Sequence, residues 1–145
     1  MSEDRTLRMQ RTIAGPVNDV FDAWVDPEIL VKWWGPEGFT IPQHEIDPRE
    51  GGAWTTTMLS PEGNKHVVSG VYKEIDRPNR LVLTWSWRQD DGSNGHETEI
   101  TVTFEPDGAG TRMHLVQQVF DTVEQAAGHN QGWESSFKDL DKLFV

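Results

Sequence analysis

The sequence predicts an α+β domain in which a curved antiparallel sheet of seven strands combines with two short helices and one long C-terminal helix. Segments of alternating apolar and polar residues, separated by turn residues, run from Thr40 to Asp121 and predict strands. Beyond Thr122, apolar residues recur at intervals of three and four, which is typical of an amphipathic helix. The length of 145 residues suits a single domain with one core, residues 1–145.

The first predicted strand runs from Arg5 to Ile13, where Leu7, Met9 and Ile13 share one face. Arg11 falls on that same face and interrupts the apolar run. At a sheet edge its aliphatic stem can pack while the guanidinium reaches water. The alternative is a charge facing the interior, which requires an acidic partner there.

Two short helices are predicted next. Gly15-Pro16 begins a helix that continues to about Trp24, with the proline in the first helical position. Asp26-Pro27-Glu28 begins the second helix with an aspartate N-cap, a proline at N1 and an acidic first turn. This helix is expected to end at Trp34, because Gly35-Pro36 provides a C-terminal glycine and a residue that cannot continue the helix.

Six further strands are predicted between Thr40 and Asp121. They are separated by turn-forming segments at residues 47–52, 60–64, 77–79, 89–95 and 105–108. The alternation places one set of side chains on the inner face: Trp54, Thr56, Met58, Leu83, Trp85, Trp87, Ile100, Val102, Phe104, Met113, Leu115, Gln117 and Val119.

The C-terminal helix begins at Thr122, which forms a capping-box pattern with Gln125. Its inner stripe comprises Val123, Ala126, Asn130, Trp133, Phe137, Leu140 and Phe144. Gly128 and Gly132 lie inside the helix, where each costs about 1 kcal/mol relative to alanine. We therefore expect the helix to bend there or to be closely approached by another segment, and a pocket to begin at this irregular place.

Composition narrows the range of functions. The net charge is −11, from 24 acidic and 13 basic residues, and the only basic cluster, Arg5, Arg8 and Arg11, is too small for a phosphate-binding surface. Nucleic acid and anionic membranes are therefore not expected partners. The absence of cysteine excludes disulfides, thiolate nucleophiles and cysteine-ligated zinc. Since the sequence has no apolar signal region and no run of ~18 apolar residues, we expect a cytoplasmic protein.

No pattern in the sequence indicates a metal, a cofactor or a catalytic group. The histidines lack metal-ligand spacing, and His114 falls on the outer strand phase; the five are His44, His66, His96, His114 and His129. Ser69, Ser135 and Ser136 have no recognisable base beside them. The glycine-rich segments 35–38 and 108–110 are not phosphate loops, because no Lys-Ser/Thr pair follows either one.

The predicted order of one strand, two short helices, six strands and a long helix is the helix-grip arrangement. Eight short motifs accompany it along nearly the whole chain: VFDAW (20–24), DPE (26–28), WWGP (33–36), GGAW (51–54), SGV (69–71), RLVLTW (80–85), GTR (110–112) and GW (132–133). In this order and spacing the chain resembles the activator-of-Hsp90-ATPase-like domains of the START-like (SRPBCC) superfamily. The resemblance implies a seven-stranded antiparallel sheet wrapped around the C-terminal helix, with a cavity between them.

The resemblance leaves three functions open, because relatives include ligand carriers, polyketide cyclases and aromatases, and a chaperone-binding domain. The favoured hypothesis is a non-catalytic domain that binds a small hydrophobic or aromatic ligand. The second is a protein-interaction domain similar to the chaperone activator. The third is a cyclase or hydrolase that uses Glu134 or a histidine as acid or base. Either a monomer or a homodimer is compatible with the sequence.

The candidate cavity residues come from the inner strand phases and the helix stripe. They are Trp34, Trp54, Met58, Trp85, Trp87, Phe104, Gln117, Asn130, Trp133, Glu134 and Phe137. Gln117 and Asn130 interrupt apolar stripes, so they either bond to the backbone or an ordered water, or orient a ligand. Glu134 is either a solvated helix residue or a cavity carboxylate, whose pKa desolvation would raise.

The adjacent tryptophans Trp33 and Trp34 cannot both be buried in one direction, since neighbouring helical residues point about 100° apart. Trp33 continues the face of Ile29 and is expected to pack inward. Trp34 is expected to border the pocket mouth, which Gly35-Pro36 would hold in place. The alternative is that both rings pack ordinarily against the C-terminal helix.

Overall fold

The computed structural model describes residues 6–35, 38–88, 91–93, 95–118, 120 and 122–144, with only the backbone of Val123. Arg5, Pro36, Val119 and Asp121, and parts of the predicted 89–95 turn, lie outside the described residues. The elements are β1 (Leu7–Ile13), α1 (Val17–Val25), α2 (Pro27–Trp33), β2 (Thr40–Ile46), β3 (Ala53–Leu59), β4 (Lys65–Asp76), β5 (Arg80–Trp87), β6 (Thr98–Asp107), β7 (Gly110–Gln118) and α3 (Val123–Lys142). This order confirms the predicted α+β class.

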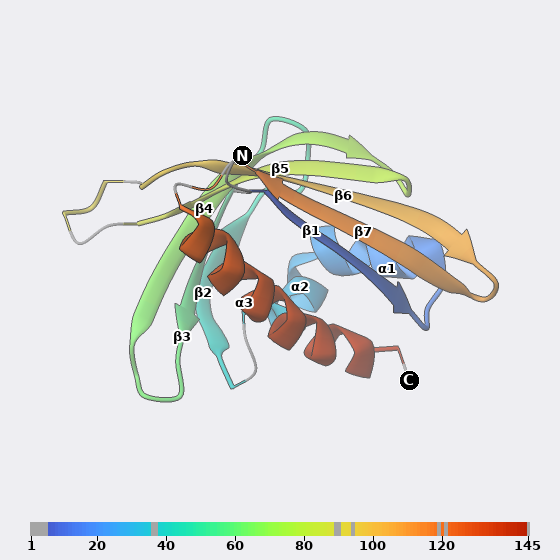
Figure 1. The fold of residues 1–145 in the computed structure, drawn as a ribbon, viewed down its shortest axis with the longest axis horizontal. Helices are drawn as coiled ribbons and strands as arrows, with labels where there is room; N and C mark the ends of the chain where they lie inside the picture. Colours follow the sequence, from blue (N-terminus) through green and yellow to red (C-terminus); the bar gives the residue numbers. More distant parts are fainter. Residues whose placement is uncertain are drawn as a thin grey trace.

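The seven strands form one antiparallel sheet in the order β1-β7-β6-β5-β4-β3-β2. The sheet curves around α3, with β1, β6 and β7 on one side of the helix and β2, β3 and β4 on the other (Figure 1). Register aligns the inner residues across strands: Leu83 lies opposite Ile100, and Ile100 lies opposite Gln117. The strand phases therefore meet on one concave face, as the alternation predicts.

The helix ends follow the predicted caps, with one correction. Asp26 Oδ1 accepts a hydrogen bond from the Glu28 amide at 3.0 Å, and Pro27 occupies the first turn of α2. The Thr122 hydroxyl accepts from the Gln125 amide at 3.1 Å at the start of α3. Pro16, however, is the N-cap of α1 with extended backbone, and the helix begins at Val17. Extended ψ at the cap is the ordinary conformation of the residue before a helix.

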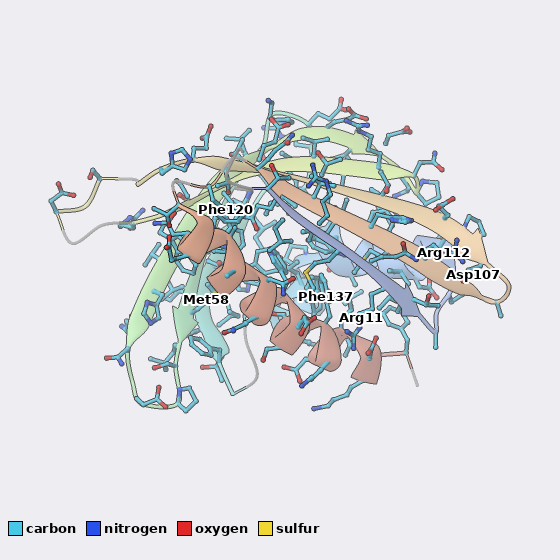
Figure 2. All side chains as sticks on the ribbon, viewed as in Figure 1. Arg11, Met58, Asp107, Arg112, Phe120 and Phe137 are labelled. Atoms are coloured by element: carbon cyan, nitrogen blue, oxygen red, sulfur yellow. The ribbon has the colours of Figure 1, made fainter. Side chains whose placement is uncertain are left out.

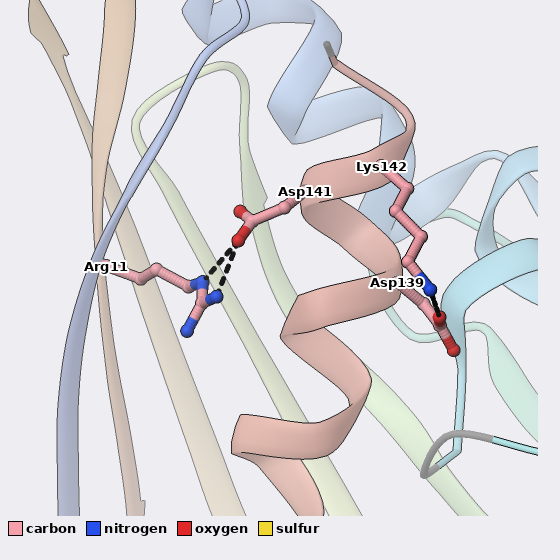
Figure 3. A network of polar contacts seen from close by, with 4 residues as sticks. All are labelled: Arg11, Asp139, Asp141 and Lys142. Carbon is pink, nitrogen blue, oxygen red and sulfur yellow. Dashed lines mark hydrogen bonds and ion pairs between the residues drawn. The ribbon is translucent and has the colours of Figure 1, made fainter.

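Arg11 finds an acidic partner on the terminal helix. Its Nε and Nη2 both donate to Oδ2 of Asp141, at 3.1 and 2.5 Å (Figure 3). The hydrogen bond and charge of Asp141 raise the pKa of Arg11, and Glu134 adds a smaller contribution of the same sign. Arg11 thus combines features of both possibilities: it lies on the edge strand β1 with its side chain 30% exposed, and it pairs with an acidic residue in the last turn of α3.

Tryptophan dominates the interior between the sheet and α3. Six of the seven tryptophans are buried, and their rings touch in a continuous cluster: Trp24, Trp33, Trp34, Trp54, Trp85 and Trp133. Phe137 extends the cluster by stacking on Trp133, with ring centroids 5.6 Å apart. Figure 2 shows side chains filling the space beneath the helix, Phe137 among them. Indole rings thus occupy much of the volume in which the family resemblance implies a cavity.

Candidate functional site

A hollow of about 160 Å³ remains where the end of α2, β3, β5 and the first half of α3 meet. Its walls are almost wholly apolar. The described residues that line it are Trp34, Gly35, Met58, Trp85, Trp87, Gly128, His129, Gly132, Trp133 and Ser136. A cavity of about 150 Å³ with apolar walls is large enough to hold benzene. The hollow therefore has the dimensions of a small aromatic molecule.

The two glycines of α3 create this space. A Cβ atom added at Gly128 or at Gly132 would meet no atom within 4 Å. Of the two alternatives for these glycines, a bend or a close approach by another segment, the structure does not show the close approach. Their missing side chains instead leave room between α3 and the tryptophans of the sheet, so the helical glycines do mark the place where the pocket begins.

Trp34 forms part of the wall at the end of α2. It is the C-cap residue, and Gly35 follows with φ of +86°. The Trp34 indole N–H donates to Oγ1 of Thr56 at 3.1 Å, and the side chain is 3% exposed. Trp33 is buried away from the hollow and donates to the carbonyl of Ala23 at 2.9 Å. Both rings nevertheless pack against α3, Trp33 on Phe137 and Trp34 on Trp133, as the alternative predicted. Only Trp34 of the two lines the hollow, as a buried wall rather than an exposed rim.

Gln117 does not line the hollow but forms a hydrogen bond with Trp133, which does. It is fully buried, its Nε2 donates to Oγ1 of Thr98 at 2.8 Å, and its Oε1 accepts from Trp133 Nε1 at 2.8 Å. Both amide ends are therefore paired with side chains rather than with backbone groups or water. The bond from Trp133 fixes the plane of an indole that faces the hollow.

The structure gathers part of the predicted set at the hollow. Trp34, Met58, Trp85, Trp87 and Trp133 line it, and Trp87 is 36% exposed at its mouth. The other predicted residues lie elsewhere: Trp54, Phe104, Gln117 and Phe137 in the core, Asn130 at intermediate exposure, and Glu134 exposed. Glu134 is therefore a solvated helix residue and not a cavity carboxylate among the described lining residues.

His129 lines the hollow although it was not predicted to, as do Gly35 and Ser136. His129 lies four residues before Trp133 on the same face of α3. Its ring contacts those of Phe120 and Trp85, with centroids 4.8 and 5.6 Å apart. Burial among these rings lowers the pKa of His129 to about 4. The signal for it in the sequence is its spacing from Trp133 and Ala126, which places it beside the inner stripe, whereas its spacing from the other histidines carries no such information.

The described residues that line the hollow are mostly aromatic or small, with the polar side chains of His129 and Ser136 among them. His129 is the one titratable side chain among the described lining residues, so these residues supply no acid–base pair. Throughout the part of the chain that the structure describes, no three His, Asp or Glu side chains group together as metal ligands would. Aromatic walls and a few polar atoms favour contact with a flat, largely apolar molecule. None of the described helices has the length and apolarity needed to cross a membrane.

The fold and the hollow between sheet and helix define a START-like, helix-grip domain. The family described as "Activator of Hsp90 ATPase homolog 1-like protein" matches residues 14–145, and the chain belongs to this family. This confirms the resemblance seen in the sequence motifs.

Solved structures support the same assignment. The AHSA1 protein from Silicibacter pomeroyi is 35% identical, with a TM-score of 0.87 over 94% of this chain and 95% of that chain. A protein from Chromobacterium violaceum is 32% identical, with a TM-score of 0.84 over 95% of this chain and 96% of that chain.

The curated activator of 90 kDa heat shock protein ATPase homolog from Dictyostelium discoideum is 25% identical over 136 residues, covering 93% of this chain. The chain spans 31% of that relative's length.

Proposed function

We propose that this domain binds a small, flat, apolar or aromatic molecule in the hollow between α3 and β5, without transforming it. One observation carries the proposal: four tryptophan rings wall a space that they do not fill, because Gly128 and Gly132 have no side chains to occupy it. A stable interior ordinarily packs tightly and keeps few voids. An apolar void that can hold an aromatic ring is a place where a ligand gains contact.

The volume limits the size of the ligand. At about 160 Å³ the hollow is below the range of roughly 300–1,000 Å³ that drug-sized ligands occupy. A single aromatic ring with a short substituent suits this space. Burial of the ligand's apolar surface would contribute about 25 cal/mol of binding free energy per Å² removed from water.

The walls of the hollow are held in place by hydrogen bonds. Thr56 accepts from Trp34, and Gln117 accepts from Trp133, so two of the four rings are fixed by buried bonds from their indole nitrogens. Contacts among the rings restrain them further. A preformed wall lowers the entropic cost of ordering the site when a ligand binds.

Filling the hollow from the helix tests the proposal. We expect Gly132→Leu to abolish binding of α-methylstyrene, a one-ring apolar probe, because the new side chain enters the open space beside Gly132. Helix stability should not suffer, since glycine costs about 1 kcal/mol in a helix interior. Gln131→Leu is the matched control, because the neighbouring Gln131 is exposed and does not line the hollow. Binding by the Gly132→Leu protein at wild-type affinity, or no binding by the wild type, would refute the proposal.

A second candidate is interaction with a chaperone, as the name of the Dictyostelium relative indicates for that protein. The observation in its favour is a polar depression on the strands at the free edge β2, whose lining includes His44, Glu45 and Arg88. Co-purification with an Hsp90-type chaperone, and stimulation of its ATPase, would test this role. Such an activity should be weakened by Arg88→Glu and unaffected by Gly132→Leu, whereas ligand binding should show the reverse pattern.

A further inference from the structure

The tautomer of His129 follows from its bond to Trp87. The indole Nε1 of Trp87 lies 3.1 Å from Nε2 of His129. An indole N–H can only donate, so Nε2 of the histidine must accept and carries no proton. In the neutral ring the proton therefore resides on Nδ1. Trp87 thus determines which nitrogen of His129 is the donor.

The Nδ1–H group of His129 has no hydrogen-bond partner among the described residues. Among the described residues, the one hydrogen bond of His129 is that with Trp87. The fully buried side-chain nitrogen atoms that lack a partner among the described residues do not include Nδ1 of His129. Nδ1 is therefore accessible to solvent. The ring itself lines the hollow.

A donor inside the wall, the indole nitrogen of Trp85, also lacks a partner. Nε1 of Trp85 is buried without an acceptor among the described residues, and Trp85 is only 6% exposed. A buried polar group left unpaired costs roughly 1–3 kcal/mol. Trp85 Nε1 thus lies unpaired within the wall without reaching the hollow, and the nearby acceptors of Thr56 and Gln117 are already used by tryptophans.

We propose that the ligand of this hollow is a neutral, flat aromatic molecule carrying a hydrogen-bond acceptor such as a carbonyl oxygen or a ring nitrogen, and that His129 selects it by donating Nδ1–H. This inference rests on the proposed ligand-binding function and adds the chemical class of the ligand. Trp87 acts as a positioning residue, because it holds His129 in the donating tautomer.

The surroundings favour a neutral acceptor over a carboxylate. None of the described lining residues is Lys or Arg, and the chain has a net charge of −11. Burial also keeps His129 uncharged near neutral pH, since its pKa is lowered to about 4. An anion entering the hollow would lose its hydration and gain no opposite charge, which is strongly unfavourable.

A matched pair of probes separates this inference from ligand binding itself. Acetophenone and α-methylstyrene have nearly the same shape, but only acetophenone has a carbonyl oxygen. Dissociation constants for both can be measured by NMR titration with the wild type and with His129→Phe. The loss of one hydrogen bond should reduce the preference for acetophenone over α-methylstyrene about three- to tenfold in the variant.

The outcomes are distinct. An unchanged preference in His129→Phe would overturn the role of His129 while leaving ligand binding intact. If neither probe binds the wild type, the proposed function fails, and this inference fails with it. A ratio of affinities is used because any effect of the substitution on the shape of the hollow acts on both probes alike.

The tautomer provides a readout that a purely structural role would not affect. In the wild type, the ¹⁵N signals of the His129 imidazole should report a proton on Nδ1. In Trp87→Phe the constraint on Nε2 is lost, so we expect both tautomers to be populated and the preference for acetophenone to fall. A wild-type spectrum with the proton on Nε2 would overturn the proposal without any binding measurement.

Discussion

The indole N–H of Trp87 donates to Nε2 of His129 across 3.1 Å, joining β5 to α3 at the mouth of the hollow. The two residues are 42 positions apart in the chain. The bond connects the one tryptophan that is partly exposed to the one titratable group among the described lining residues. It therefore links the sheet, the helix and the proposed ligand site in one contact.

Protonation of His129 should make the stability of the domain depend on pH. Well above pH 6.5 the histidine is neutral in both the folded and the unfolded chain and contributes no pH dependence. As the pH falls, the unfolded chain takes up the proton first, because burial lowers the pKa of the folded state to about 4. The free energy of unfolding falls through this window, and the total loss approaches about 3 kcal/mol below pH 4.

Urea unfolding of the wild type and of His129→Gln between pH 7.5 and pH 4.5 measures this effect. Glutamine can still accept from Trp87 and does not titrate, so the variant should lose less stability on acidification. Parallel losses in the two proteins would show that His129 is not the group responsible.

Gln117→Leu should destabilise the core by about 2–4 kcal/mol, because it leaves the Trp133 indole N–H and the Thr98 hydroxyl without their buried partner. Chemical denaturation gives the magnitude. Combining Gln117→Leu with Trp133→Phe removes one orphaned donor, so the double variant should be less unstable than the sum of the two single losses. Additive losses would contradict a direct coupling between Gln117 and Trp133.

Gly70→Ala should prevent stable folding, or cost at least about 3 kcal/mol, since an added Cβ would lie 1.9 Å from the backbone oxygen of Thr84. Gly128→Ala is the matched control, because its Cβ would enter open space and improve helix propensity by about 1 kcal/mol. Thermal melts should therefore move in opposite directions. A wild-type melting temperature for Gly70→Ala would show that β4 and β5 can separate at little cost.

Arg11→Met should cost about 1 kcal/mol or less, because the bond to Asp141 joins two side chains that are 30% and 37% exposed. The loss should shrink in 1 M salt, where charges at the surface are screened. A double-mutant cycle with Asp141→Asn isolates the coupling between the two residues. A coupling well above this value, or one that salt does not alter, would indicate a buried ion pair instead.

Much of the fold was predictable because its signals are local. The alternation through Leu83 and Trp85 identified the inner face of β5, and Asp26-Pro27 located the start of α2. Such patterns depend on strand pleat and helix caps, which a few neighbouring residues determine.

The site was predicted less completely, because its contacts join distant segments. Gln117 was placed correctly on the inner face, but sequence could not show that its partners are Thr98 and Trp133. Spacing likewise puts His129 beside Trp133 and cannot reveal Trp87 opposite it. The open space at Gly132 depends on which side chains the sheet presents across from the helix, and no local pattern records that.

NMR titration of the wild type with acetophenone tests the central claim most directly, because the indole N–H signals report on seven tryptophans at once. We predict saturable shifts for Trp85, Trp87 and Trp133, which line the hollow, and little change for Trp33, which does not. Unchanged indole signals at saturating probe would contradict ligand binding at this site. Shifts of equal size across all seven would likewise contradict it.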